Sequence, residues 1–477
     1  MVFDNWFISL LLLLLYLYMI LSTISVLLME NRNPVRSLSW VIVLVLLPII
    51  GIVFYLIIGQ NYRKRKIFSK KSVRHLSKLI KVDEQPSDFQ NFVTDDNHLN
   101  LIKLLYRNSD AAGYGFNRIK FYSDGESTFK SMFEAISNAK HHIHIEFFIF
   151  GNDRISNRLR EILIEKAKQG VRVRMIYDYL GSFNLSGMYL KSLRDAGVYV
   201  KPFLPLRLRL RRSKINFRNH RKLLIVDGMI GFTGGLNFAD RYIFGNRLGK
   251  WRDTFVMFEG SAVQGLQSQF LTDWFFVERK LITDPKYYPM PQKFNENLVQ
   301  IVSSGPDSDW ESIMQGITSA IMSSTRYVYI HTPYFVPTET LLHALIITAL
   351  SGVDVQLMIP TRSDSRLTDA CTFSYLGDVL DAGVKVHQYR EGFLHSKAIV
   401  IDDFISIIGS ANLDERSFNQ NFEANAFIYE KASAIELRSL FMEDIANCRE
   451  ITLADWNNRK RSQKLKESFA RLFSPIV

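Results

Sequence analysis

The chain has 477 residues, of which 47% are apolar and 22% are charged, as in a folded protein of two or three domains. Its 59 Lys and Arg residues against 47 Asp and Glu give a net charge of +12, which indicates an anionic partner: nucleic acid, an anionic bilayer or a phosphorylated substrate. The two cysteines, Cys371 and Cys448, exclude a disulfide framework and a cysteine-based zinc site.

Two uncharged stretches, residues 5–29 and 37–62, open the chain. Each is long enough to reach the about 20 apolar residues that cross a bilayer. A cleaved signal peptide is the alternative for the first stretch, but no basic segment precedes it and no small-x-small cleavage site follows. We therefore expect two transmembrane helices within residues 1–62. A shallow hairpin that does not cross fully is the other arrangement of the same residues.

Basic residues follow the second stretch directly, in the segment RKRKIFSKKSVR at 63–74. By the positive-inside rule they favour a multi-pass protein of the cell membrane whose catalytic domain is cytoplasmic. Arg32 and Arg36, between the two stretches, favour the opposite orientation. We interpret residues 63–114 as a basic juxtamembrane linker.

Beyond this linker the sequence repeats itself. AISNAKHHIHIEFFIF at 135–150 corresponds to AIMSSTRYVYIHTPYF at 320–335, GVRVRMIY at 170–177 to GVDVQLMI at 352–359, and AGVYVKPF at 196–203 to AGVKVHQY at 382–389. Helical patterns alternate with apolar strands in both copies, which predicts an α/β fold. We expect two related halves over 115–285 and 298–450, joined by a linker at 286–297.

Each half carries the same polar pattern, H-x-K-x₄-D. It comprises His220, Lys222 and Asp227 in the first half and His395, Lys397 and Asp402 in the second. If the segment is a strand, His and Lys two residues apart share one face, whereas Asp lies at the turn that follows. We therefore expect His and Lys to face the substrate, and Asp to support the end of the strand or its neighbours.

A turn rich in small residues follows each pattern and carries an asparagine. The residues concerned are Asn237, Ser410 and Asn412, which we expect to bind substrate. Two lysines and two amides suit a phosphodiester anion. Two histidines suit double displacement, in which one attacks phosphorus and the other gives a proton to the leaving alcohol. The lysines already balance the phosphate charge, and the sequence has no Walker-type loop or carboxylate cage, so we expect no metal and no cofactor.

A carboxylate follows each turn: Asp253 in WRD and Glu423 in NFE. Such a group can hold an imidazole by its second nitrogen. The sequence leaves open whether each carboxylate serves the histidine of its own half or that of the other half.

The two patterns with their turns resemble the phospholipase D superfamily. NPVR at 33–36, HTPYF at 331–335 and NLDERS at 412–417 resemble the bacterial cardiolipin synthases within it. The resemblance covers nearly the whole chain. It implies two pseudo-symmetric α/β/α halves behind a membrane anchor, and transfer of a phosphatidyl group between two phosphatidylglycerol molecules with release of glycerol. It also implies that His220 is the nucleophile and His395 the acid and base.

Two basic stretches outside the motifs suit a membrane surface. LRLRLRRSKINFRNHRK at 206–222 alternates Leu and Arg, which gives one apolar and one cationic face if it is extended; the alternative is a solvated basic loop. We interpret residues 451–477 as a basic amphipathic tail with Leu465, Phe469 and Leu472 at helical spacing. It forms either an interfacial helix or a helix packed on the domain.

The expected partners are phosphatidylglycerol, anionic membrane lipid and the membrane, with no nucleic acid. The same site also suits a membrane-bound phospholipase D hydrolase, a serine-accepting phosphatidyltransferase or, against the two expected spans, a nuclease. A protein that only binds anionic lipid is a further alternative, which the complete motifs in both halves disfavour.

Overall fold

The computed structural model describes residues 2–29, 38, 40–44, 51, 92–93, 95–205 and 216–476. It divides into two compact units, one formed by residues 1–67 with 206–216 and the other by residues 68–205 with 217–477. The described part of the first unit includes helix α1 (Val2–Met29). None of the helices built from described residues is long and apolar enough to cross a membrane. The second expected span and residues 206–215 of the Leu/Arg stretch lie largely or wholly outside the described residues.

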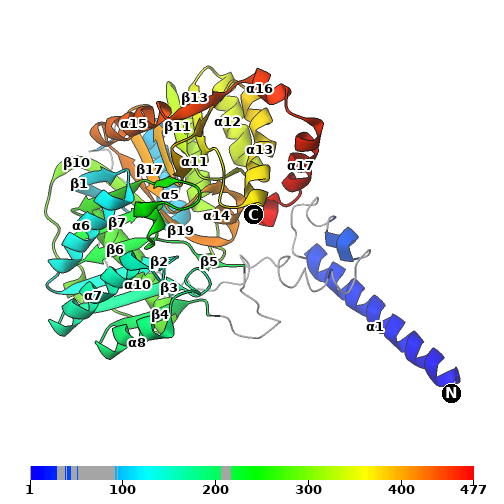
Figure 1. Ribbon diagram of the computed structural model, residues 1–477, viewed down its shortest axis with the longest axis horizontal. Coiled ribbons are helices and arrows are strands. Elements are labelled where there is room, and N and C mark those ends of the chain that lie inside the picture. The colour runs from blue at the N-terminus through cyan, green and yellow to red at the C-terminus, as the bar shows by residue number, and fades with distance from the viewer. Residues whose placement is uncertain are drawn as a thin grey trace. The chain divides into compact units, whose positions relative to one another are not determined.

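The second unit is a mixed α/β domain that contains both copies of the repeat (Figure 1). The first copy comprises β1 (Gly113–Tyr122), α6 (Gly125–Ser137), β2 (His142–Phe147), α7 (Arg154–Lys168), β3 (Arg172–Asp178), α8 (Gly187–Asp195), β4 (Tyr199–Phe203), β5 (Arg218–Asn219), β6 (Leu223–Val226), β7 (Ile230–Gly234), α9 (Arg241–Phe244), β8 (Lys250–Arg252), β9 (Phe255–Glu259) and α10 (Ala262–Glu278).

The short helix η4 (Pro285–Tyr287) lies between the two copies. The second copy comprises β10 (Asn295–Ser304), α11 (Ser312–Met322), β11 (Tyr327–His331), β12 (Phe335–Val336), α12 (Glu339–Leu350), β13 (Asp354–Pro360), α13 (Arg366–Asp381), β14 (Lys385–Tyr389), β15 (Gly392–Leu394), β16 (Ala398–Ile401), β17 (Ile405–Gly409), β18 (Leu413–Asp414), α14 (Glu415–Asn419), β19 (Asn421–Tyr429), α15 (Lys431–Ile445) and β20 (Cys448–Ile451). It is followed by α16 (Leu453–Asn457), α17 (Arg461–Arg471) and η5 (Ser474–Ile476).

One sheet runs through both copies, in the order β20-β14-β13-β11-β16-β17-β19-β10-β1-β9-β7-β6-β2-β3-β4. Its order is mirrored about the antiparallel pair β1 and β10, where Tyr114 lies opposite Val299. The structure thus has the duplicated α/β fold that the repeat predicted. Strands β6 and β16, which carry the apolar part of the two motifs, occupy equivalent places in this mirrored order.

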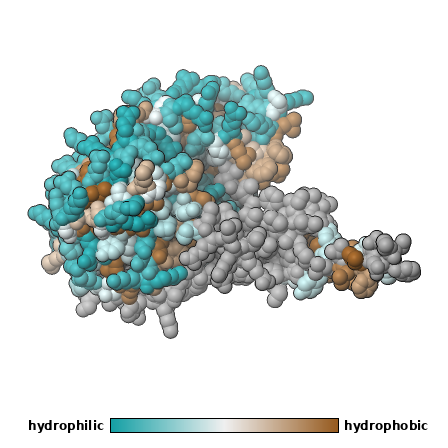
Figure 2. Space-filling view, turned by 60° about the horizontal axis from the view of Figure 1, so that its bottom comes forward, coloured by the Kyte–Doolittle hydropathy of each residue, from teal (hydrophilic) through white to brown (hydrophobic). Residues whose placement is uncertain are grey.

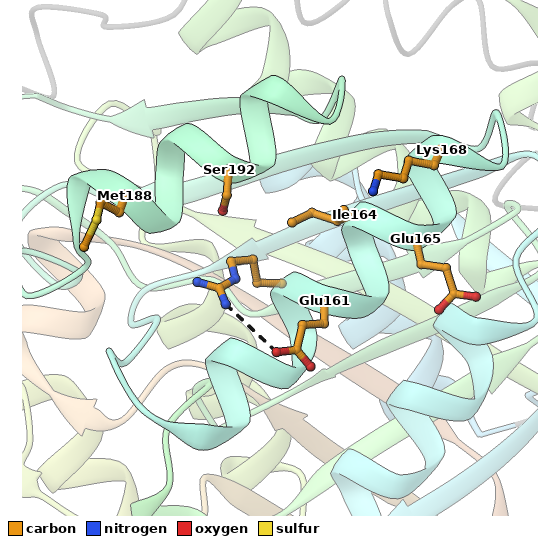
Figure 3. A pocket seen from close by; sticks show the side chains of 7 residues that line it. Glu161, Ile164, Glu165, Lys168, Met188 and Ser192 are labelled. Atoms are coloured by element: carbon orange, nitrogen blue, oxygen red, sulfur yellow. Dashed lines mark ion pairs between the residues drawn. The ribbon is translucent and has the colours of Figure 1, made fainter.

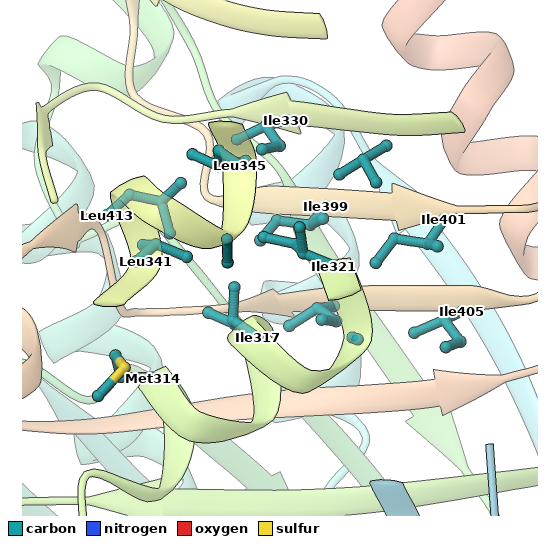
Figure 4. Packing of buried hydrophobic residues seen from close by; sticks show 14 of the residues in the cluster. Met314, Ile317, Ile321, Ile330, Leu341, Leu345, Ile399, Ile401, Ile405 and Leu413 are labelled. Atoms are coloured by element: carbon teal, nitrogen blue, oxygen red, sulfur yellow. The ribbon is translucent and has the colours of Figure 1, made fainter. Parts of the chain in front are cut away.

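Helices cover both faces of the sheet, and successive strand residues are buried on alternate faces. Ile143 and Ile145 of β2 pack with α6, α7 and α8, whereas His144 between them stacks on Phe270 of α10 at 4.4 Å. In the second copy Ile330 packs among residues of α11 and α12 (Figure 4). The neighbouring Tyr329 stacks on Phe441 of α15. Each copy is therefore a three-layer α/β/α unit.

One segment that we expected to lie outside the halves is packed on the second copy. Helix α5 (Asp96–Ser109), at the end of the expected linker 63–114, buries Leu101, Ile102 and Leu105 in the core of the second copy. Gln300 of β10 donates hydrogen bonds to the carbonyl oxygens of Ile102 and Ala111. This part of the expected linker therefore belongs to the folded domain, because the apolar face of an amphipathic helix is buried against its core.

Candidate active site

The two motif histidines lie just before strands β6 and β16. Residues 220–222 and 395–397 belong to no strand, which corrects our expectation that His and Lys lie within a strand and share one of its faces. Their N–H groups pair across the halves instead: the His220 N–H donates to the Phe422 carbonyl at 2.9 Å and the His395 N–H to the Arg252 carbonyl at 2.7 Å. Each motif therefore starts on a segment supplied by the other half.

Each imidazole is held by the carboxylate of the opposite half. His220 Nδ1 lies 2.9 Å from Glu423 Oε1, and His395 Nδ1 lies 2.7 Å from Asp253 Oδ2. Both carboxylates are fully or almost fully buried, and the two imidazoles are 12% and 8% exposed. The carboxylates fix Nδ1, so Nε2 of each ring is the nitrogen available for chemistry.

Two short parallel strand pairs create this exchange. Strand β5, just before His220, pairs with β19, which carries Glu423. Strand β15, just before His395, pairs with β8, which ends one residue before Asp253. The question left open by the sequence is thus answered by backbone pairing between the halves.

The two motif lysines are also buried. Lys222 Nζ donates to the His220 carbonyl and Lys397 Nζ to the His395 carbonyl, both at 2.5 Å. Burial lowers the pKa of Lys222 to about 7 and that of Lys397 to about 8, and the Lys397 ammonium group further lowers the pKa of Lys222. The carboxylates of Asp253 and Glu423 raise both pKa values, but burial outweighs them, so a bound anion would favour the charged form of both lysines.

The two histidine–carboxylate pairs differ in protonation. Burial lowers the pKa of His220 to about 4, and although burial opposes it, His220 and Lys222 lower the pKa of Glu423 below its usual value. Burial also lowers the pKa of His395 well below its usual value, but it raises the pKa of Asp253 to about 7. At neutral pH the first pair is a neutral imidazole on a carboxylate, whereas the second pair can still hold a proton.

Asp227 and Asp402 hold backbone N–H groups at strand starts and make no hydrogen bond to the described side chains of the motif histidines His220 and His395. Asp227 accepts hydrogen bonds from the backbone N–H groups of Lys140, His141 and His142 at 2.7–2.8 Å, at the start of β2. Asp402 accepts from the N–H groups of residues 325–327 at 2.6–2.9 Å, at the start of β11. Both residues have positive φ, 56° and 52°. This is the supporting role at a turn that the spacing suggested.

The turn residues that we expected to bind substrate are mostly occupied by the protein. Asn237 accepts from the Ile149 N–H at 3.1 Å and donates to the Tyr242 hydroxyl at 3.0 Å. Ser410 donates to Glu423, and Asn412 donates to Asp414 at 3.0 Å. Among the described residues the Oδ1 atom of Asn412 has no hydrogen-bond partner. These contacts favour positioning of the site; direct contact with substrate stays a prediction.

The turns also explain why the two carboxylates differ. At Gly235, the counterpart of Ser410, an added Cβ would lie 2.2 Å from Asp253 Oδ1. The first half therefore needs a residue without a side chain beside its short carboxylate, whereas the second half uses a serine hydroxyl to hold the longer Glu423.

Two buried arginines, which the sequence analysis missed, hold the carboxylate residues by their backbone. Arg221 Nε donates to the Glu423 carbonyl at 3.1 Å, and its Nη1 lies 2.7 Å from Asp273 Oδ1 on α10. Arg252 Nη1 donates to the Asp253 carbonyl at 2.8 Å, and its Nη2 lies 2.7 Å from Asp444 Oδ2 on α15. We call these the two arginine clamps.

The clamps are equivalent in space but not in sequence. Asp273 and Asp444 occupy matching helices, whereas Arg221 lies inside the first motif and Arg252 lies beside the carboxylate of the first half. The motif position of Arg221 is Ser396 in the second half, where its hydroxyl lies 2.6 Å from that of Thr254. The sequence signal for the clamps is weak: Asp273 lies among apolar residues of α10, but α15 carries several other charged residues besides Asp444.

The third group at each clamp also differs. Glu146 of β2 lies at the first clamp, where burial and the Asp273 carboxylate raise its pKa well above the usual value. The residue that matches Glu146 in the repeat is His331, whose Nε2 lies 3.1 Å from Asp444 Oδ2 and whose pKa is lowered by burial. A protonated Glu146 and a neutral His331 carry no charge, so at each clamp one arginine is balanced by one aspartate.

The sequence models of two protein families match this chain. "Cardiolipin synthase, PLD-like domain" matches residues 132–274 and 317–445, and "Phospholipase_D-nuclease N-terminal" matches residues 14–60. A cardiolipin synthase of Geobacillus sp. (strain WCH70) is 40% identical over 94% of this chain and 90% of its own length. The chain belongs to the cardiolipin synthase family. The major cardiolipin synthase ClsA of Bacillus subtilis (strain 168) is also 40% identical, over 98% of this chain and 99% of its own length.

Members of the cardiolipin synthase family are phosphatidyltransferases of the phospholipase D superfamily, and this chain is an enzyme of that class. A crystal structure of phosphatidylserine synthase from Haemophilus influenzae Rd KW20 has a TM-score of 0.60 to this chain at 16% identity, covering 79% of this chain and 100% of that one. That likeness shows a shared fold.

A shallow pocket of about 580 Å³ lies between α7 and α8 of this cardiolipin synthase family member (Figure 3). Its lining includes Arg160 and Glu161, whose charged groups are 4.0 Å apart, and Met188. It contains neither a motif residue nor a carboxylate of the histidine pairs, so we assign the chemistry to the buried cluster at the junction of the halves. Within the described residues, no group of three or more His, Cys, Asp and Glu side chains is arranged to hold a metal ion.

Proposed function

We propose that this enzyme makes cardiolipin by moving a phosphatidyl group from one phosphatidylglycerol to another, with release of glycerol. The observation that carries the proposal is the exchanged pairing of His220 with Glu423 and of His395 with Asp253 around two buried lysines. The similarity to cardiolipin synthases over nearly the whole chain supports the choice of substrate.

In the first step we assign the nucleophile to His220. Its imidazole is neutral at pH 7. The Nδ1–H group donates a hydrogen bond to Glu423, so the Nε2 lone pair can attack phosphorus. The bond from phosphorus to the glycerol oxygen breaks, and this oxygen takes a proton from the His395–Asp253 pair. The products are free glycerol and a phosphatidyl group on His220.

In the second step the hydroxyl of another phosphatidylglycerol returns a proton to the His395–Asp253 pair and attacks phosphorus. The bond between phosphorus and His220 breaks and cardiolipin leaves. Lys222 and Lys397 face a phosphate of constant negative charge through both steps and hold it in a site from which most water is excluded. Because bound phosphate offsets their charge, it also favours the protonated form of the second pair.

We further propose that two N-terminal helices anchor this enzyme in the bacterial cell membrane with the catalytic domain in the cytoplasm. The uncharged stretches 5–29 and 37–62 and the basic segment 63–74 support this arrangement. The N-terminal family model covers residues 14–60. Protease protection of tags placed at the two ends in sealed inverted vesicles tests it: a protected C-terminal tag would contradict it.

Product analysis tests the reaction. The purified enzyme in phosphatidylglycerol micelles should yield cardiolipin and glycerol in equal amounts, with phosphatidic acid as a minor product. The matched control is His220→Asn, which keeps a polar side chain but cannot form the intermediate. If phosphatidic acid dominates and cardiolipin is absent, the enzyme is a hydrolase and the proposal fails.

Added serine separates the transferase alternatives. A serine-accepting enzyme would divert the phosphatidyl group to phosphatidylserine, whereas a cardiolipin synthase keeps its product ratio. Cleavage of single-stranded DNA by the same preparation, lost in His220→Asn, would support a nuclease instead.

A further inference from the structure

The C-terminal helix α17 packs its polar side on the domain and leaves its apolar side in solvent. Leu465, Phe469 and Leu472 are 72%, 63% and 74% exposed, whereas Glu467 and Ala470 are buried. A helix that only covers a core does the reverse. These three apolar side chains therefore remain largely exposed to solvent instead of packing in a core.

Specific contacts hold the polar side in place. Arg471 Nη2 lies 2.8 Å from Asp378 Oδ2 on α13, and the Ala470 carbonyl accepts from the Cys371 thiol at 3.0 Å. Glu467 pairs with Arg459, which precedes the helix. The orientation of α17 is thus fixed from the inside, so its apolar side cannot turn inward without breaking these contacts.

Basic residues flank the apolar side. With 3.6 residues per turn, Leu465, Phe469 and Leu472 fall within about 60° of one another around the helix axis. Lys464 and Lys466 lie about 100° from Leu465, one on each side. Lys460 and Arg461, at the start of the helix, are exposed as well. An apolar strip with a cationic border matches the boundary between acyl chains and anionic headgroups.

We propose that α17 is a membrane-docking helix, with Leu465, Phe469 and Leu472 inserted in the surface of an anionic bilayer. This goes beyond the proposed reaction, because it does not depend on which alcohol accepts the phosphatidyl group. A protein partner with an apolar groove would need its own acidic border, whereas an anionic bilayer supplies both features. On the face of the described domain that Figure 2 shows, the surface is mostly hydrophilic, with hydrophobic residues in separate groups.

The docking helix is linked to the active site by its last residues. The Pro475 carbonyl in η5 accepts from the Gln420 side chain at 2.9 Å, and Ser474 lies 3.1 Å from the Tyr375 hydroxyl. Gln420 caps α14, which starts directly after Asp414, the partner of Asn412. Docking of α17 would hold this turn of the second half next to the lipid from which substrate comes.

Site-directed spin labelling of the full chain in nanodiscs tests the docking. A label at Phe469→Cys should collide more with oxygen, which concentrates in lipid, than with a water-soluble nickel chelate. The matched control is Met188→Cys on α8, an 80% exposed apolar residue that should show the opposite preference. The unsubstituted chain, labelled in parallel, measures background from Cys371 and Cys448.

Three results would overturn the proposal. Aqueous behaviour at both positions would show that α17 does not enter the bilayer. Shielding of the label at residue 469 from both reagents would show that protein covers the helix, either a second copy or another part of this chain. If replacement of phosphatidylglycerol by phosphatidylcholine in the nanodisc left the label at the same depth, the basic border would have no role.

A kinetic experiment separates docking from chemistry. The triple variant Leu465→Ser, Phe469→Ser and Leu472→Ser changes only exposed side chains, so its unfolding midpoint should match that of the unsubstituted chain. Its kcat/KM with phosphatidylglycerol in bilayers should fall about tenfold or more, because three apolar side chains lose their lipid contact. Activity on short-chain phosphatidylglycerol in solution should be kept. An equal loss on both substrates would point to a damaged site instead of lost docking.

Discussion

The two arginine clamps predict unequal costs for two equivalent substitutions. Asp444→Asn leaves Arg252 buried beside His331, which is neutral and can only add positive charge. Loss of one partner from a buried ion pair typically costs about 3–5 kcal/mol. Asp273→Asn leaves Arg221 beside Glu146, whose raised pKa stems from burial and then from Asp273 itself.

Removal of the Asp273 charge therefore lets Glu146 ionise and replace it. The remaining cost is the weakening of the hydrogen bonds between Arg221 and residue 273, about 1–2 kcal/mol in the free energy of unfolding. We expect Asp273→Asn to lower the free energy of unfolding by clearly less than Asp444→Asn. The measurement is equilibrium urea unfolding of the full chain in detergent at pH 7.5, followed by tryptophan fluorescence.

The double variant Glu146→Gln with Asp273→Asn is the decisive control, because Arg221 then has no carboxylate. It should fall to the level of Asp444→Asn. Asp195→Asn, which removes an exposed pair with Lys191, should cause no measurable loss. If Asp273→Asn alone is as costly as Asp444→Asn and the added Glu146→Gln changes nothing, the proton-exchange argument is refuted.

Three further predictions concern the chemistry. With a phosphatidyl ester of p-nitrophenol, which leaves without a proton, His395→Ala should still accumulate a phosphohistidine detectable by mass spectrometry, whereas His220→Ala should not; the reverse result would exchange the two roles. The rate of glycerol release should fall as pH rises above about 7 to 8, because Asp253 with pKa about 7 and the lysines Lys222 and Lys397 with pKa about 7 and 8 lose their protons in that range; a rate that rises there in stopped-flow pH profiles would contradict this. Addition of EDTA should leave turnover unchanged, since the two lysines supply the positive charge, and a loss that one metal alone restores would show otherwise.

The duplicated fold and both motifs were predictable because they repeat in sequence. The segments around His144 and Tyr329 carry the same alternation of apolar residues, and the structure places them on matching strands β2 and β11. The role of Asp227 and Asp402 also followed from local spacing, since the turn after a short strand lies within a few residues of the motif.

The pairing of histidines with carboxylates was not predictable from the sequence. It depends on β5 and β15, which have two and three residues and give no periodic signal. Local periodicity cannot reveal a contact whose partners are 203 residues apart, as for His220 and Glu423. The arginine clamps were missed for a related reason: Arg221 and Arg252 occupy the same place in space but different places in the repeat.

The exchange of carboxylates makes the two halves mutually dependent. If each carboxylate served its own histidine, a single half would carry a complete pair and would need its partner only for the second imidazole. Here His220 without Glu423 is a buried imidazole with no acceptor for its Nδ1 proton, and His395 without Asp253 has no proton reservoir near pH 7. Neither half can therefore hold even one functional histidine by itself. The unequal pairs, one ionised and one able to carry a proton, then allow two nearly identical sequence motifs to perform the two different roles that a double displacement requires.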